Sequence, residues 1–331
     1  MLITKVDSWE ALDSRGRPTV ATRVALEGGA QGVALVPSGA SAGSHEALEL
    51  RDGGDRYGGR GVRTAVGHVI DTLAPLVTGL TPAQVDAALR AADRSPSFSV
   101  VGANAVLSVS LAAQRAAADG TSLARYLAAD AGPLLLPMPM VNILSGGAHA
   151  GRMLDVQDFL VVPVGATSFA QAVEWAVAVR EAATRLALAG GHAQAVLVAD
   201  EGGLGLPLAT NRAALDLLTR AIRAAGFEPG TDVAIAIDVA ATQFFHDGRY
   251  RLAREQRELT ATGLIAEIAR WCDHYAVISV EDALAEDDWE GWQEATAVLG
   301  ERVELVGDDL FVVARARRGC GRRPRERHSV K

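Results

Sequence analysis

The sequence predicts an α+β N-terminal domain followed by a (β/α) barrel. Three apolar runs between residues 231 and 311 each end at acidic residues, and segments with helical periodicity separate them. The first 36 residues instead alternate apolar and polar side chains between glycine-rich turns. Short buried strands that alternate with helices are typical of parallel βα units, and alternation between tight turns is typical of antiparallel strands. In a (β/α) barrel the carboxyl ends of the strands converge on one mouth, so we expect the acidic residues to meet there.

The N-terminal domain is expected to span residues 1–134. It begins with a three-stranded antiparallel meander over residues 2–10, 19–26 and 31–36. Four helices should follow and pack on this meander, and the first of them is expected to stop at Pro75, because proline interrupts a helix. These predicted helices cover residues 62–73, 82–92, 102–118 and 122–129.

A loop dense in Gly, Ser and Ala follows the meander and runs from Val36 to Glu46. Small residues allow backbone N–H groups and hydroxyls to approach a charged ligand closely, which would suit a mobile lid. The alternative is an ordinary turn, since small-residue loops are most often only that.

The barrel is expected to span residues 135–312. Ser168 should cap one of its helices, and the other two helices with clear periodicity cover residues 262–273 and 289–299. Apolar runs predict strands at residues 136–142, 155–162, 195–199, 233–238, 276–281 and 303–307.

Acidic residues at the ends of three of these strands predict a divalent-metal site formed by Asp238, Glu281 and Asp308. Carboxylates that lie close together repel and raise one another's pKa unless a cation neutralises them. Oxygen ligands from Asp and Glu suit Mg²⁺ better than zinc. The alternative is that acids at strand ends are helix N-caps, an explanation that is stronger for one such residue than for all three.

Other polar side chains are candidates for ligand contacts. Gln157 and Asp158 interrupt an otherwise apolar strand, where buried polar groups need hydrogen-bond partners or a ligand. His149 lies in a Gly-rich loop and could reach a phosphate, although a loop histidine is more often simply solvated. The predicted strand at residues 195–199 leads into Asp200-Glu201-Gly-Gly203, whose glycines permit a substrate to approach the backbone.

The composition argues against several classes of protein. A net charge of −8 and a pI near 5.4 argue against nucleic-acid binding. Cys272 and Cys320 lie far apart and form no CxxC motif, so neither a disulfide framework nor a zinc site is indicated. The N-terminus has no apolar signal core and no apolar stretch reaches the length of a membrane span, so we expect a cytoplasmic protein that does not bind a membrane.

A series of motifs in fixed order resembles enolase, from about Ile3 to Val312. The motifs are Leu12-Asp-Ser-Arg-Gly-Arg-Pro-Thr19, Pro37-Ser-Gly-Ala-Ser-Ala-Gly43, Glu46-Ala-Leu-Glu-Leu-Arg-Asp52, Gly102-Ala-Asn-Ala105, Asp200-Glu-Gly-Gly203, Ser279-Val-Glu-Asp282, Glu286-Asp-Asp-Trp289 and Gly307-Asp-Asp-Leu310. The resemblance implies an enolase-type (β/α) barrel, dependence on Mg²⁺ and a homodimer. It also implies a small phosphorylated carboxylate as substrate, with interconversion of 2-phosphoglycerate and phosphoenolpyruvate.

The resemblance further implies roles for particular residues. Asp238, Glu281 and Asp308 match the first Mg²⁺ site, and Ser41 matches a loop serine that meets a second Mg²⁺ when the lid closes. Glu201 matches the acid that helps the 3-hydroxyl to leave.

Ser41 is also an expected substrate contact, and three more residues match substrate-contacting positions: His149, Gln157 and Asp158. Asp158 is one methylene shorter than the glutamate of the family, Ser145 replaces an asparagine, and Gln243 replaces a glutamate. The segment 94–98 also departs from the family's pattern. These departures suggest a paralogue, and an alternative function is therefore action on a phosphonate analogue, as in carboxyphosphonoenolpyruvate synthesis for phosphinate antibiotics. A second alternative is a non-catalytic metal-binding remnant.

The last segment, 313–331, is expected to be an Arg-rich tail unrelated to the family, such as a shifted reading frame would give. The alternative is a basic tail that binds an acidic partner. If the tail is unrelated to the family, the barrel is incomplete, since about 200 residues follow Pro137 and a typical barrel has roughly 250 residues in all. Lys5 and Lys331 are the only lysines, and arginine cannot replace lysine as a base. Lys331 is therefore the remaining candidate base, and we expect slow turnover.

Overall fold

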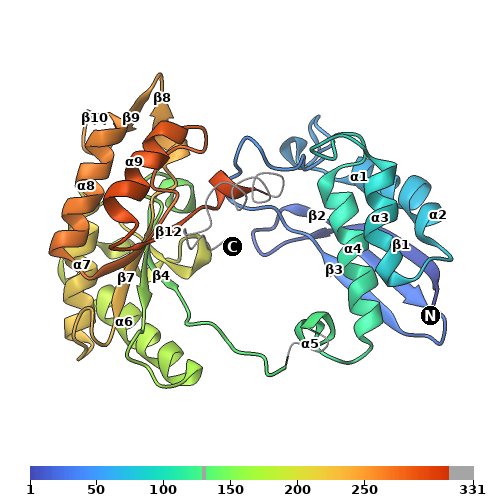
Figure 1. Cartoon of the computed structure of the whole chain (residues 1–331), viewed down its shortest axis with the longest axis horizontal. Coiled ribbons are helices and arrows are strands. Elements are labelled where there is room, and N and C mark those ends of the chain that lie inside the picture. Colours follow the sequence, from blue (N-terminus) through green and yellow to red (C-terminus); the bar gives the residue numbers. More distant parts are fainter. Residues whose placement is uncertain (129–131, 313–331) are drawn as a thin grey trace. The chain divides into compact units, whose positions relative to one another are not determined.

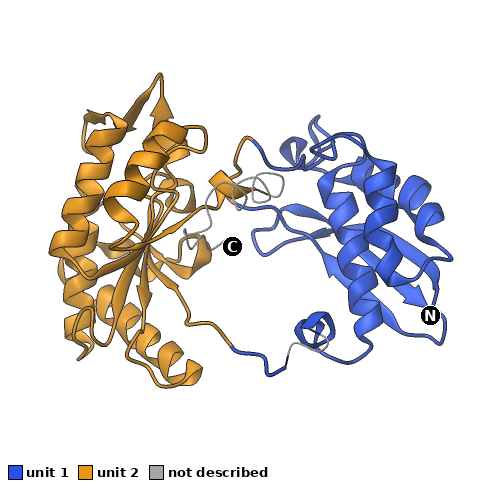
Figure 2. Ribbon diagram, viewed as in Figure 1, with its two compact units in different colours: residues 1–39, 45–135 blue, residues 40–44, 136–331 orange. Residues whose placement is uncertain are grey.

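The computed structural model describes residues 1–128 and 132–312. The chain divides into two compact units, which Figure 2 shows in separate colours. Unit 1 contains Met1–Gly39 and His45–Leu135, and unit 2 contains Ala40–Ser44 and the chain from Leu136 onward. The predicted tail and Lys331 lie outside the described residues, so their assignments stay predictions.

Unit 1 is built on the predicted antiparallel meander. Strands β1 (Ile3–Leu12), β2 (Pro18–Leu26) and β3 (Gln31–Leu35) pair in the order β1-β2-β3. Helix α4 (Ala103–Ala118) lies against β2 and β3 (Figure 1). The helix can come this close because residue 32 is glycine, where a Cβ atom would lie 2.3 Å from the backbone oxygen of Ala112.

The remaining helices of unit 1 agree with the predicted segments in all but one respect. Pro75 does not stop the first helical segment, because a π-helical turn at Val69–Leu73 leads directly into α2 and places Pro75 in its first turn. Proline is tolerated there, since the first backbone N–H groups of a helix have no partner within it. The helices are α1 (Arg63–His68), α2 (Ala74–Val77), α3 (Pro82–Ala92) and α5 (Leu123–Ala128).

Unit 2 is organised by a mixed six-stranded sheet with the order β12-β11-β7-β5-β4-β6. As predicted, the three strands that end in acidic residues run parallel, whereas β5 runs antiparallel to both β4 and β7. The strands are β4 (Val141–Ser145), β5 (Asp158–Val162), β6 (Leu204–Gly205), β7 (Ala234–Asp238), β11 (Val277–Glu281) and β12 (Glu304–Val306).

Two strand predictions in unit 2 are wrong. The strand predicted at residues 136–142 forms later, as β4, because Pro137 and Pro139 lack the N–H groups that a central strand must donate. The run 195–199 forms no strand: a 3₁₀ turn covers Ala193–Val196, and the side chains of residues 196–198 are about two-thirds exposed. The edge of β4 that this run would need is paired with β6 instead.

Helices surround this sheet and complete a core of aliphatic side chains. Helices α6 and α7 contact β4 and β5, and α8 contacts β11 (Figure 1). A small antiparallel sheet, formed by β8, β9 and β10, follows β7. The helices are α6 (Phe169–Ala189), α7 (Asn211–Ala224), α8 (Ala261–His274) and α9 (Trp289–Leu299), and the small sheet comprises Phe245–His246, Arg249–Leu252 and Arg257–Leu259. Within residues 1–128 and 132–312, no helix combines the length and the apolar character needed to cross a bilayer.

Asp93 closes the turn that leads to α4. One oxygen of its carboxylate accepts hydrogen bonds from the N–H and hydroxyl of Ser95, and the other accepts from the N–H groups of Val100 and Val101. Burial raises the pKa of Asp93, but these hydrogen bonds outweigh it and lower the pKa to about 2. The ionised carboxylate therefore stabilises unit 1.

We expect Asp93→Asn to lower the free energy of unfolding at neutral pH by about 1–3 kcal/mol, because hydrogen bonds to a charged acceptor are lost. The folded-state pKa lies below the ordinary value of 3.8, so this contribution is present above pH 4 and is lost as the pH falls toward 2. Urea unfolding at pH 7 and at pH 3 measures the difference. Asp71→Asn, at an exposed position, is the control. An equal effect of both substitutions would contradict the assignment.

Candidate active site

Strand register places three acidic side chains in one row at the mouth of the sheet. Asp158 on β5 lies opposite Asp238 on β7, and Asp238 lies opposite Glu281 on β11. All three residues are at most 6% exposed. Because β5 runs antiparallel to β7, the first residue of β5 lies beside the last residue of β7. The sheet therefore brings together two predicted metal ligands and one predicted substrate contact.

A cluster of three carboxylates could hold a metal ion within the described residues. Asp238, Glu281 and Asp282 each offer one oxygen, and these oxygens lie within 4.8 Å of one another. Buried carboxylates at this separation repel, and oxygen donors of this kind suit Mg²⁺. The group therefore fits Mg²⁺, but it contains Asp282 in place of the predicted ligand Asp308.

Asp308, the third predicted ligand, lies in the turn that follows β12 and is exposed to solvent. Asp282 holds this turn: its two carboxylate oxygens accept the backbone N–H groups of Asp308 at 3.1 Å and Asp309 at 2.9 Å. Burial, together with the charges of Asp309 and Glu281, raises the pKa of Asp282 to about 7. Asp282 was not among the predicted site residues, although its position beside Glu281 at a strand end is a usable signal.

The predicted substrate contacts lie next to this cluster. His149, in a 3₁₀ turn at Gly147–Ala150, contacts Asp158 at 2.7 Å between Nδ1 and Oδ2, and Glu201 has a carboxylate oxygen within 4.8 Å of both side chains. Glu201 has a left-handed backbone conformation, with φ of 58°, and the residue is exposed. The structure thus groups the predicted proton donor with two predicted substrate contacts.

Asp158 is also held from the other side. The amide of Asn142 donates hydrogen bonds to Asp158 and to the hydroxyl of Ser145, and both of these residues are buried. Ser145 itself is packed against Gly203, where a Cβ atom would lie 2.2 Å from the Ser145 hydroxyl. Asn142 was not among the predicted site residues, since a single asparagine forms no pattern in the sequence. Its hydrogen bonds show that it fixes Asp158 beside His149.

Burial lowers the pKa of His149, but the hydrogen bond and charge of Asp158, with the nearby charges of Glu201 and Asp200, outweigh it and raise the pKa above 6.5. A charged imidazolium in this position would attract an anionic ligand. Because the pKa is raised on folding, the pairing with Asp158 stabilises the protein below pH 6.5, and this contribution is lost as the pH rises through the raised pKa.

Asp158→Asn should lower the pKa of His149, because burial then dominates. An NMR titration of the imidazole, assigned with a His149→Gln variant, measures the change. Asp200→Asn, which removes a smaller influence on His149 than Asp158 exerts, should cause a smaller change in the same direction. An unaltered His149 pKa in Asp158→Asn would show that this carboxylate does not control the imidazole.

Ser41 belongs to the short segment 40–44 that groups with unit 2, and it is partly exposed. At the end of this segment, the N–H of Ser44 donates to both oxygens of Glu286, at 3.0 and 3.1 Å, and the Ser44 hydroxyl donates to one of them at 2.6 Å. Tyr250 steadies the neighbouring backbone, since its hydroxyl accepts the N–H of Ala285 at 3.1 Å and donates to Asp288 at 2.6 Å. The segment that carries Ser41 is therefore fixed at its C-terminal end.

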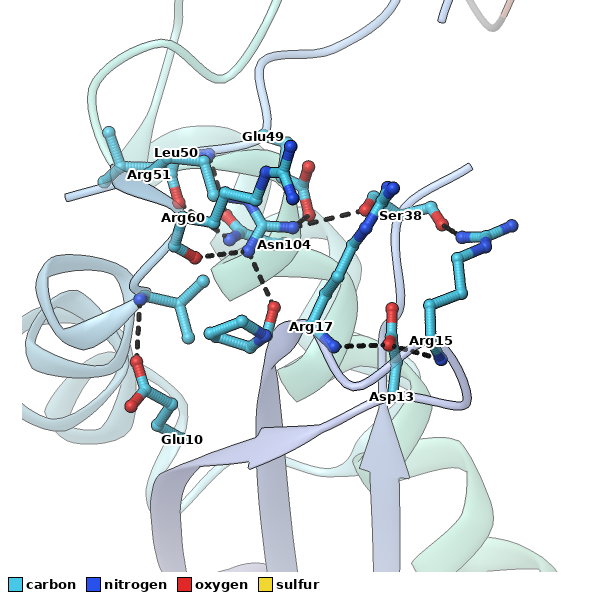
Figure 3. Close-up of polar contacts among 12 residues, drawn as sticks. Glu10, Asp13, Arg15, Arg17, Ser38, Glu49, Leu50, Arg51, Arg60 and Asn104 are labelled. Carbon is cyan, nitrogen blue, oxygen red and sulfur yellow. Dashed lines mark hydrogen bonds and ion pairs between the residues drawn. The ribbon is translucent and has the colours of Figure 1, made fainter. Parts of the chain in front are cut away.

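The N-terminal stem of the same loop is fixed within unit 1 by two arginines (Figure 3). Arg15 donates to the backbone oxygen of Ser38 at 2.7 Å, and Arg51 donates to the Ser38 hydroxyl at 3.2 Å. Arg51 also donates to Glu49 and to the backbone oxygens of Pro18 and Arg60. Arg15 is presented by a tight turn in which one oxygen of Asp13 accepts the N–H groups of residues 15 and 17.

We expect Arg51→Met to accelerate hydrogen exchange at residues 36–39 by roughly 10-fold or more, because hydrogen bonds from a charged donor are lost. Ser38→Ala, which removes only the hydroxyl contact, should give a smaller increase. Arg60→Met is the control, since Arg51 contacts only the backbone oxygen of Arg60. Exchange that is the same in Arg51→Met and in the unaltered protein would contradict the role of Arg51 in the stem.

Comparisons with known proteins agree with this geometry. The N-terminal domain model of enolase matches residues 3–127, and the model described as the enolase C-terminal TIM barrel domain matches residues 133–319. An enolase from Acidothermus cellulolyticus is 50% identical over 318 residues, which cover 94% of this chain and 72% of that protein.

An α+β domain joined to a barrel domain with clustered acids at the strand ends defines a (β/α)-barrel protein with a candidate metal-dependent site. The matches to both domains and the identity to a curated enolase specify the family. The chain belongs to the enolase family, a family of carbon–oxygen lyases.

Proposed function

We propose that the protein is a Mg²⁺-dependent lyase that interconverts 2-phosphoglycerate and phosphoenolpyruvate. The observation that carries the proposal is the row of buried carboxylates on β5, β7 and β11 next to the His149–Asp158 pair. The enolase relative supports the same reaction class. The homodimer and the cytoplasmic location stay predictions.

In this proposal Asp238, Glu281 and Asp308 hold Mg²⁺, and Asp282 positions the turn that carries Asp308 through its two backbone hydrogen bonds. A bound Mg²⁺ would neutralise the substrate carboxylate and stabilise the dianion that forms when the α-proton leaves. Ser41 would contact a second ion from the loop, as the resemblance implies.

The described residues supply the other functions of the proposed site. The His149 imidazolium, held by Asp158, binds the anionic substrate, and Gln157 lines the same region through its contact with Asp238. Glu201 donates a proton to the departing 3-hydroxyl, so that loss of the α-proton and of this hydroxyl yields phosphoenolpyruvate and water. The base predicted at Lys331 lies outside the described residues.

The substrate is tested by assaying the full chain with 2-phosphoglycerate and with a phosphonate analogue, each with and without Mg²⁺. Turnover of 2-phosphoglycerate that requires Mg²⁺ supports the proposal. Turnover of the phosphonate alone would support the paralogue predicted from Asp158 and Ser145. Binding of Mg²⁺ without turnover of either compound would support the non-catalytic alternative.

Calorimetry should show that Asp238→Asn and Glu281→Gln each weaken Mg²⁺ binding by at least roughly 10- to 100-fold, because each removes a direct ligand. The control is Asp273→Asn, in the surface ion pair with Arg302. Asp308→Asn and Asp282→Asn distinguish a ligand from a supporting residue, and the proposal expects the larger loss for Asp308→Asn. Unchanged affinity in both Asp238→Asn and Glu281→Gln would exclude this metal site.

A further inference from the structure

A chain of three side-chain hydrogen bonds joins the His149 turn to Asp238. The N–H of Ala148 donates to Oε1 of Gln243 at 3.0 Å. Nε2 of Gln243 donates to Oε1 of Gln157, and Nε2 of Gln157 donates to Oδ2 of Asp238 at 3.0 Å. Gln243 lies in the 3₁₀ turn at Ala241–Phe244, which follows β7, so three separate segments meet in this chain.

Each amide in the chain can have only one orientation. A backbone N–H can only donate, and an ionised carboxylate can only accept. With a donor at the Ala148 end and an acceptor at the Asp238 end, both glutamine amides must present oxygen toward Ala148 and nitrogen toward Asp238. Residue 243 must therefore both accept and donate, which an ionised glutamate cannot do. The donor of Gln243 and the acceptor of Gln157 therefore complement each other.

The turn at Gly147–Ala150 packs directly against Gln157 and Gln243. Gly147 has a φ of +42°, and a Cβ atom there would lie 3.1 Å from the Cα atom of Gln157 and 3.2 Å from Oε1 of Gln243. Gln157 is 5% exposed and Asp238 is 6% exposed, so solvent cannot readily replace a lost partner. A buried amide left without its hydrogen bond is costly, which holds Gln243 to Gln157, and the exposed hydrogen bond from Ala148 then links the turn to Gln243.

We propose that Gln243 is a positioning residue that fixes the turn bearing His149 relative to Asp238, through Gln157. The inference rests on the proposed function, since it assigns His149 to substrate and Asp238 to metal. Ala148 directly precedes His149, so the hydrogen bond at Ala148 sets where the imidazole stands. Gln243 touches neither substrate nor metal in this arrangement and acts only through its neighbours.

Hydrogen exchange of the Ala148 amide tests this series of hydrogen bonds without reference to catalysis. The measurement uses the full-length protein without metal. Gln243→Leu removes the acceptor and should raise the exchange rate roughly 3- to 10-fold. Gln171→Glu is the matched control. The Gln171 side chain accepts from Thr167 through an oxygen that glutamate retains, so Gln171→Glu should leave exchange at Ala148 unchanged. Unchanged exchange in Gln243→Leu would overturn the proposal.

Gln243→Glu tests the direction of the chain with a side chain of the same shape. The ionised form lacks the donor for Gln157, whereas the protonated form supplies it. A glutamate side chain ordinarily has a pKa of about 4.3, so stability relative to the unaltered protein should be lower at pH 7, where the introduced carboxylate is ionised, than at pH 4. Gln243→Leu should show a deficit that does not depend on pH. The side chains of Asp238, His149 and Asp158 lie nearby and carry ionisable groups, so each variant is compared with the unaltered protein at the same pH. A pH-independent deficit in Gln243→Glu would overturn the proposed direction.

Kinetics test the consequence for substrate. At pH 8 both substitutions at residue 243 should raise KM for 2-phosphoglycerate roughly 3- to 10-fold, with a smaller change in kcat, because His149 is displaced. An unchanged KM in both variants would overturn the positioning role. If the unaltered protein does not turn over 2-phosphoglycerate, the proposed function fails, and the exchange and stability measurements still decide whether Gln243 holds the turn.

Discussion

Repulsion between buried carboxylates is the constraint on which the rest of unit 2 depends. Pairing of β5, β7 and β11 places Asp158, Asp238 and Glu281 side by side, and a charge in such a place must be compensated. The compensation visible among the described residues differs along the row. Asp158 is held by an imidazole and an amide, whereas Asp238 accepts hydrogen bonds from the Gln157 amide and from the backbone N–H of Ala240. The Asp158 end of the row therefore suits an anion, and the Asp238 end suits a cation.

Neutral donors around Asp238 have a clear electrostatic effect. An amide or a backbone N–H orients a carboxylate without cancelling its charge, whereas a lysine or arginine would neutralise it. The same device appears at Asp282, which is held by two backbone N–H groups, and at Glu286, which is held by Ser44. These hydrogen bonds fix the position of each carboxylate, as a cation site requires of its oxygen ligands.

Much of this arrangement could be predicted from the sequence. Apolar runs that end in acidic residues predicted the parallel strands β7, β11 and β12, and the spacing of apolar residues predicted most helices within one or two positions. The run at residues 195–199 misled, because β-branched residues favour a strand only where an edge is available to pair with. The role of Pro75 was also misjudged, since a proline in the first turn of a helix looks the same in sequence as one that ends a helix.

The supporting residues of the site were beyond prediction for a different reason. Asp282, Asn142 and Gln243 act through hydrogen bonds to residues that are distant in sequence or on separate segments, and a single chain shows no pattern for such contacts. The acids themselves could be found because they interrupt apolar periodicity, which is a local signal. The antiparallel direction of β5 is a non-local property too, and it alone brings Asp158 next to Asp238.

The placement of the acids at strand ends has a consequence for how this protein can change by insertion and deletion. Side chains of a strand alternate between its two faces, so a one-residue slip of β7 would turn every side chain to the opposite face. Such a slip would bring Ile237 or Val239 opposite Asp158 in place of Asp238. The slip would also exchange the isoleucines of β7, which pack in the main core, with Ala236, which packs with Leu160 and Val162 on the other face. A change of length within β7 should therefore disturb the row of acids and the packing of both faces at once.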